Sequence, residues 1–217
     1  MSEHRTTLST ARLAGSWDAS LQQHISELNM RFLELFAGAA SGTAGVMRTP
    51  VVLELRAEWR QLPRAGLQRL ATCPYLLVDA AFAAPAHWRA LLTGAVQDTA
   101  RAPVSVDAVS TDLVRRTLVL AWHLSRANPL AACIRLGMSQ ECIELIAARS
   151  LHQLEAVADT RPTWVRPRWE NRVEVWRQLL YAACDDQSTR LRQLQLRGLQ
   201  LLAGSMVNRS LERAARQ

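Results

Sequence analysis

Residues 107–127, DAVSTDLVRRTLVLAWHLSRA, decide the fold class of this chain. The stretch contains neither proline nor glycine, and Leu113, Leu120 and Leu124 fall on one side of a helix with about 3.6 residues per turn. Trp122 adds a large apolar side chain in the same stretch. The spacing therefore predicts a long amphipathic helix over 107–127.

The sequence after this helix carries a series of helix start and stop signals. Pro129 fits the first turn of a second helix, and Gly137 is suited to end that helix in the left-handed conformation. Ser139 and Ser150 are typical N-caps for the next two helices. The segment 161–168 holds two prolines and is predicted to be irregular. Two further helices are expected, over 170–183 and 188–204.

The sequence before residue 107 is less regular. Residues 1–20 are interpreted as a loose leader, and the glycine-rich run 38–45 is interpreted as a linker. Between them, apolar residues at 4-3-4-3 spacing predict one helix; they are Leu21, Ile25, Leu28, Phe32 and Leu35. Shorter elements follow: a helix over 49–61, a brief strand or extended segment at 75–78, and a helix over 87–96. Together these patterns predict an all-α fold.

The two halves of the chain resemble each other. Residues 87–92, HWRALL, recur as VWRQLL at 175–180, and residues 49–57, TPVVLELRA, align with SQECIELIA at 139–147. The offsets are nearly constant and the order is conserved between the halves, although chance similarity in an alanine- and leucine-rich chain is the alternative. We interpret the pattern as a tandem duplication. Three regions follow: a leader over 1–20, a first helical repeat over 21–105 and a second over 107–217.

The second half resembles a known family. The residues that carry the resemblance are TLVLAWHL at 117–124, AACIRLGM at 131–138, SLHQL at 150–154, VRPRW at 165–169 and LQLRGLQLL at 194–202. Together they make residues 112–205 similar to FlhD, a subunit of the flagellar transcriptional activator. The first half resembles the opening helix of the same family through His24-Ile25 and Leu28-Asn29-Met30.

The FlhD resemblance implies several properties. It implies an all-α, cytoplasmic regulator of transcription, an activator that dimerises and works with an FlhC-like protein partner at promoters. In this chain the fold would be a compact helical bundle of two FlhD-like repeats. The cysteine that links the family's dimer would fall at Val165, so that disulfide cannot form here.

The amino-acid composition excludes several kinds of catalytic and ligand-binding site. All 26 basic residues are arginine, so a phosphate-binding loop with its lysine and a lysine Schiff base are both excluded. No catalytic motif is recognised, and no enzyme activity, cofactor or metal site is expected. No signal peptide and no membrane span are predicted. The four cysteines, Cys73, Cys133, Cys142 and Cys184, lie far apart and are expected to be free thiols.

The net charge of +7 and the isoelectric point near 10.4 favour an anionic partner, of which DNA comes first. Residues 161–217 contain eleven arginines and five acidic residues, and tryptophans are interleaved with the arginines. Arginine suits both phosphate and guanine edges. Arg190 and Arg197 are expected to share one helical face, with Arg192 beside them. The predicted DNA-binding residues are Arg166, Arg168, Arg172, Arg177, Arg190, Arg192 and Arg197.

Residues 131–146 also fit a helix-turn-helix-like element around Gly137. If residues 139–148 were a recognition helix, Gln140, Glu141 and Glu144 would face the DNA. The two carboxylates would be repelled by the phosphates, so a structural role for this segment is favoured. Two functions remain open. One is a DNA-binding transcriptional regulator of FlhD type. The alternative is a helical adaptor or assembly protein that binds protein partners without contacting DNA. Self-association into homo-oligomers is also left open.

Overall fold

The computed structural model describes residues 3–42, 49–93, 108–161, 164–186 and 189–214 of the chain, with side chains described from residue 18 to residue 205. Helices dominate these residues, and the expected all-α fold is confirmed. The first half contains α1 (Glu3–Ser41), α2 (Pro50–Glu54), α3 (Arg56–Gln61), α4 (Arg64–Ala71), β1 (Val78–Asp79) and α5 (Pro85–Leu92). The second half contains α6 (Ala108–Ala127), α7 (Pro129–Leu136), α8 (Gln140–Ala147), α9 (Leu151–Thr160), β2 (Arg166–Pro167), α10 (Val173–Cys184) and α11 (Thr189–Ala214).

Several predicted helix boundaries are confirmed. Gly137 has φ +69 and ends α7 in the left-handed conformation. The Ser139 hydroxyl accepts a hydrogen bond from the backbone N–H of Cys142 at the start of α8. Ser150 and Gln153 form a reciprocal capping box at the start of α9. Each of these caps satisfies a backbone group that the first or last helical turn leaves without a partner.

Other boundaries differ from the sequence-based expectation. The leader expected over 1–20 is wrong from Glu3 onward, because α1 begins there and runs without a break to Ser41. No proline interrupts residues 3–41, and the single Gly15 is not enough to stop a helix. The helix expected over 49–61 is two helices that meet at Leu55. The irregular segment at 161–168 includes strand β2. The linker expected over 38–45 is wrong at residues 38–41, which are the end of α1. Residues 43–45 of that linker and residues 94–107 lie outside the described residues.

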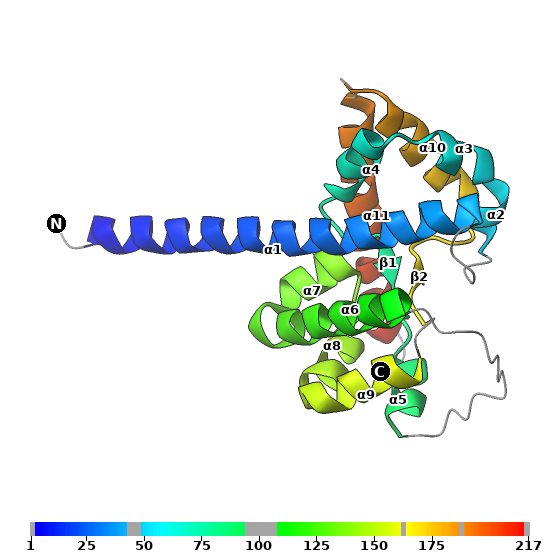
Figure 1. Ribbon diagram of the computed structural model, residues 1–217. Coiled ribbons are helices and arrows are strands. Elements are labelled where there is room, and N and C mark those ends of the chain that lie inside the picture. The colour runs from blue at the N-terminus through cyan, green and yellow to red at the C-terminus, as the bar shows by residue number, and fades with distance from the viewer. Residues whose placement is uncertain (1–2, 43–48, 94–107, 162–163, 187–188, 215–217) are drawn as a thin grey trace.

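The helices form two groups, one on either side of α1 (Figure 1). One group contains α2, α3, α4 and α10, and the other contains α5, α6, α7, α8 and α9. The strands β1 and β2 lie between the two groups, and α11 passes behind them (Figure 1). A single core of buried apolar side chains runs through the described residues, with Trp59, Trp88 and Trp176 among its largest members.

The two halves exchange a helix. Helix α5 belongs to the first half by sequence but packs against α8 of the second, whereas α10 belongs to the second half and packs against α2, α3 and α4 of the first. On α10, the Trp176 ring lies 6.2 Å from the Phe32 ring and 5.8 Å from the Trp59 ring. Burial of these aromatic rings supplies a large share of the contact between the halves.

The exchange passes through the β1–β2 pair. The strands are antiparallel, and Val78 lies opposite Pro167 while Asp79 lies opposite Arg166. Shortly after each strand comes a non-glycine residue with positive φ: Ala81 has φ 54 and Trp169 has φ 56. These positions are 88 residues apart, the same offset that relates HWRALL to VWRQLL. In both halves, therefore, the chain passes through a residue with positive φ shortly after its strand, a conformation that is uncommon for non-glycine residues.

Candidate nucleic-acid interface

Arg168, one of the seven predicted DNA-binding residues, is a core residue. It is 5% exposed, and its guanidinium donates hydrogen bonds to the backbone carbonyls of Leu76 (2.6 Å), Val78 (3.0 Å) and Leu136 (2.8 Å). A buried arginine with these partners cannot reach phosphate, so its assignment to a DNA surface is wrong. Instead it connects β2 to the first half and to the end of α7.

Arg166 and Arg172 lie at the β1–β2 pair and line one surface depression of about 550 Å³. Both are exposed. The Arg166 guanidinium donates to the Glu170 carboxylate at 3.2 Å, whereas Arg172 forms no ion pair with a described residue. These two members of the predicted set therefore line the same pocket.

The Arg177 guanidinium forms ion pairs with two carboxylates. Its guanidinium lies 2.6 Å from Glu174 on the same helix and 3.4 Å from Glu58 on α3. The hydrogen bond to Glu174, followed by the charge of Glu174 and then Glu58, raises the pKa of Arg177 above its ordinary value. Two neighbouring carboxylates repel phosphate, so Arg177 contributes little to an anion-binding surface.

The remaining three arginines lie on α11. Arg190, Arg192 and Arg197 are all exposed, and among the described residues none of them has an ion-pair partner. Leu191, Leu194, Gly198 and Leu202 form the packed stripe of the helix. At about 100° per residue, Arg190 and Arg197 lie together on one flank of this stripe, as expected. Arg192 lies on the opposite flank, so the expectation that it sits beside them is wrong.

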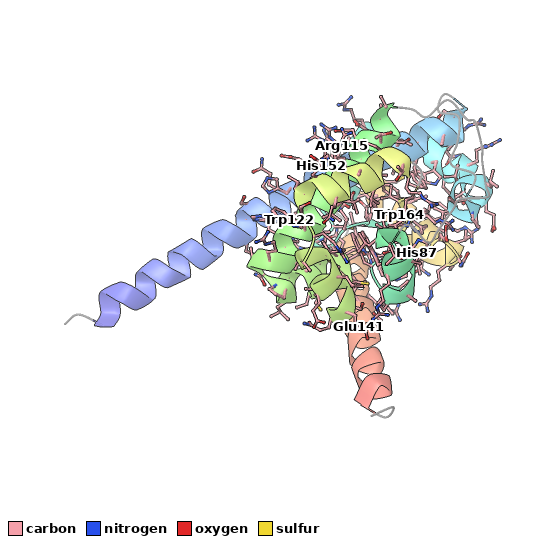
Figure 2. The ribbon with its side chains drawn as sticks, turned by 90° about the horizontal axis from the view of Figure 1, so that it is seen from below. His87, Arg115, Trp122, Glu141, His152 and Trp164 are labelled. Carbon is pink, nitrogen blue, oxygen red and sulfur yellow. The ribbon has the colours of Figure 1, made fainter. Side chains whose placement is uncertain are left out.

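The α7–α8 corner does not provide a basic face. Glu141 accepts a hydrogen bond from Arg89 of α5 at 2.5 Å, and the exposed side chains of Gln140 and Glu144 are hydrogen-bonded to each other at 3.0 Å. Figure 2 shows Glu141 close to α5. Glu141 of α8 thus helps to hold the exchanged helix α5, in line with the structural role favoured from the sequence.

First-half residues that were not among the predicted site residues share the depression with Arg166 and Arg172. Asp79, Ala81, Ala84 and His87 all line it. The repeat offset of 88 places Ala81 at the position of Trp169 and Ala84 at that of Arg172. That offset was the signal from which these residues could have been found.

The four cysteines are free thiols: Cys73 and Cys142 are buried, Cys133 is half-buried and Cys184 is exposed. Burial raises the pKa of Cys73 to about 12, so its reactive thiolate does not form near neutral pH. No group of three or more histidine, cysteine, aspartate or glutamate residues within the described parts of the chain could hold a metal ion. None of the described helices is both long enough and apolar enough to cross a membrane.

We expect one thiol, Cys184, to react quickly in the folded protein and the other three to react only as the protein opens. Ellman's reagent added at pH 8 should give a fast phase of one equivalent, and urea should release the remaining three. The Cys184→Ser variant should lack the fast phase and keep the slow one. A fast phase that persists in this variant would contradict the burial of the other thiols.

Residues 111–207, less than half of the chain, match the family model described as Flagellar transcriptional activator (FlhD). The resemblance recognised over 112–205 is thereby confirmed. No curated protein matches the chain. No solved structure matches it either.

Proposed function

We propose that this protein is a DNA-binding regulator of transcription that acts at promoters together with a partner subunit. The observation that carries the proposal is the match of residues 111–207 to the flagellar transcriptional activator family. That segment contains most of α6, the whole of α7 to α10 and most of α11, and it includes every arginine of the predicted DNA-binding set. Exchange of α5 and α10 makes the fold of this segment depend on the first half.

The DNA-binding surface is best supported on α11. Between Asp186 and Glu212 the chain contains four arginines and no acidic residue. Arg190 and Arg197 lie two helical turns apart on one flank of the helix, roughly 10 Å along its axis. Arginines in this arrangement can contact neighbouring phosphates without the repulsion that a carboxylate would add. Arg166 and Arg172 would form a second contact at the β1–β2 pair.

We expect the double variant Arg190→Gln, Arg197→Gln to weaken DNA binding by the same factor on every sequence tested. Each phosphate contact releases counterions, and the plot of log affinity against log salt has a slope of about −0.9 per contact. Loss of two contacts should therefore make the slope shallower by about 1.8. Fluorescence anisotropy with labelled promoter fragments, at salt concentrations from 50 to about 200 mM, measures both quantities.

The matched control is Arg56→Gln, Arg60→Gln, which removes the same charge from exposed positions of α3. This control should keep the salt dependence of the wild type. If the two double variants behave alike, the α11 surface has no special role in DNA binding. If the wild type fails to bind DNA both alone and with the co-purified partner, the proposal as a whole is wrong.

The second candidate function, a helical adaptor that does not contact DNA, is supported by apolar side chains on the same helix. Leu196 and Leu201 of α11 are 54% and 37% exposed. Large apolar side chains at the surface are typical of protein interfaces when they lie among arginines. Under this hypothesis Leu196→Ser, Leu201→Ser abolishes co-purification of the partner, and the arginine variants change nothing.

A further inference from the structure

The depression at the β1–β2 pair is built from both halves of the chain. Ala81 and Ala84 of the first half and Trp169 and Arg172 of the second half all line it. By the offset of 88, Trp169 corresponds to Ala81 and Arg172 corresponds to Ala84. The first half therefore has a small side chain at two lining positions where the second half has a large one. The depression has a volume of about 550 Å³, which is within the range of small-ligand sites.

Two tryptophans give this depression, hereafter the ribbon pocket, an aromatic wall. The Trp164 ring lies 4.6 Å from the buried Trp88 ring and 5.8 Å from the His87 ring. Figure 2 labels His87 and Trp164, which lie near each other. Trp169 makes an edge contact with Tyr75 at 5.6 Å. Both indoles are only half-buried. They are therefore fixed by the core behind them and still have surface available for a ring to stack on.

The formal charges of the ribbon pocket cancel, and Arg172 is the lining arginine that has no carboxylate partner among the described residues. Four charged side chains line it, and Arg166 and Glu170 pair with each other at 3.2 Å. The carboxylate of Asp79 accepts a hydrogen bond from the backbone N–H of Phe82 at 3.3 Å. Arg172 is exposed and has no ion-pair partner among the described residues. Its guanidinium can form a paired hydrogen bond with a carboxylate or a phosphate.

We propose that the ribbon pocket binds a planar aromatic ring that bears an anionic group. The ring stacks on Trp164 and Trp169, and the anionic group pairs with Arg172. The ligand chemistry is shared by nucleoside monophosphates and by aromatic carboxylates. This site goes beyond the proposed regulatory function, because it would let a small molecule act on the contact through which the two halves exchange α5 and α10.

Isothermal titration calorimetry of the full chain tests the site. The probes are adenosine 5′-monophosphate and indole-3-acetate, and the half-probes are adenosine, which has only the ring, and ribose 5-phosphate, which has only the anion. Binding of either complete probe at least tenfold tighter than the half-probes supports the proposal. The probe that binds identifies the source, nucleotide or carboxylate. If neither complete probe binds more tightly than its parts, the proposal is overturned.

Two variants locate the binding. Arg172→Gln removes the charge-assisted hydrogen bond and should weaken binding of the complete probe by about tenfold or more. Ala84→Leu adds a larger side chain to the lining of the ribbon pocket while leaving every arginine in place, and it should abolish binding. Arg56→Gln is the control for charge and should bind as the wild type does. If Arg172→Gln and Ala84→Leu both bind like the wild type, the probes bind elsewhere and the ribbon pocket is not the site.

The two activities can be separated with the same variants. Because Ala84→Leu keeps all the arginines, its affinity for DNA in the absence of probe should equal that of the wild type. Conversely, Arg190→Gln, Arg197→Gln should bind the probe normally. If the wild type binds DNA but none of the probes, the ligand site is overturned and the regulatory function is unaffected. If the wild type binds a probe but not DNA, only the regulatory function is overturned.

Discussion

Replacing Gly198 with alanine should lower the free energy of unfolding by roughly 1–3 kcal/mol, although alanine is the better helix former. Gly198 lies in α11 where this helix crosses Tyr75. An alanine Cβ at this position would overlap the Tyr75 hydroxyl and ring and would lie 2.6 Å from the Cε1 atom. Since Tyr75 is fully buried, the ring has no free space to move into, and either the ring or α11 must shift. Urea unfolding followed by circular dichroism measures the loss.

The matched control is Gly204→Ala on the same helix. A Cβ at residue 204 meets no atom within 4 Å, so this variant should be neutral or should stabilise the protein by about 0.5–1 kcal/mol. A second test removes the Tyr75 hydroxyl, which the alanine Cβ would overlap. The Tyr75 hydroxyl is buried beside the Cys73 thiol, which is only a weak hydrogen-bond partner, so Tyr75→Phe should recover part of the stability lost in Gly198→Ala. Equal stability of Gly198→Ala and Gly204→Ala would show that α11 does not cross Tyr75 closely.

Arg168→Gln is expected to have the largest effect of any single substitution, a loss of about 3–5 kcal/mol in the free energy of unfolding. The guanidinium is the hydrogen-bond donor for three buried carbonyls, those of Leu76, Val78 and Leu136. A glutamine is too short to reach all of them, and each unsatisfied carbonyl in the core costs free energy. Chemical denaturation of the purified variant measures the change.

Two comparisons isolate this role of Arg168. Arg172→Gln makes the same chemical change at an exposed position four residues further along the chain and should alter stability by less than about 0.5 kcal/mol. Arg168→Lys keeps the positive charge but loses the planar fork, so it should remain clearly less stable than the wild type. If lysine restores full stability, charge rather than the set of three hydrogen bonds is what the core requires.

The sequence predicted the second half of the fold better than the first because its helix signals are local. Ser139, Ser150 and Gly137 act on backbone groups within a few residues of themselves, and the structure has all three in the expected roles. In the first half, the polar residues near the start suggested a leader. A long helix there depends on the absence of a strong stop signal, which is a weaker indication.

The exchange of helices could not be predicted from local signals at all. Which half α10 packs against is decided by contacts such as Trp176 with Trp59, between residues far apart in the sequence. The repeat offset predicted that α5 and α10 correspond, and their shared place after a strand agrees with this. The duplication itself stays a prediction.

The arginine cluster shows why composition predicts a surface only in part. Arg166, Arg168 and Arg172 are close in sequence, yet the structure places Arg168 in the core and the other two at a pocket. Strand alternation puts residues two apart on the same side and so would place Arg168 with Arg166, but Arg168 lies beyond the end of β2 (Arg166–Pro167). A strand of two residues gives too little pattern for the sequence to reveal which side each arginine takes.

Exchange of α5 and α10 within one chain makes the folded unit insensitive to dilution. Two separate chains that exchanged helices would come apart as their concentration fell, whereas a covalent link keeps each helix at a high local concentration near its binding site. A cut between residues 93 and 108 would therefore leave two pieces, each lacking a helix that the other carries. Such pieces would depend on each other for folding, as in fragment complementation. In addition, any substitution would change one surface of this protein, whereas in a symmetric dimer it would always change two.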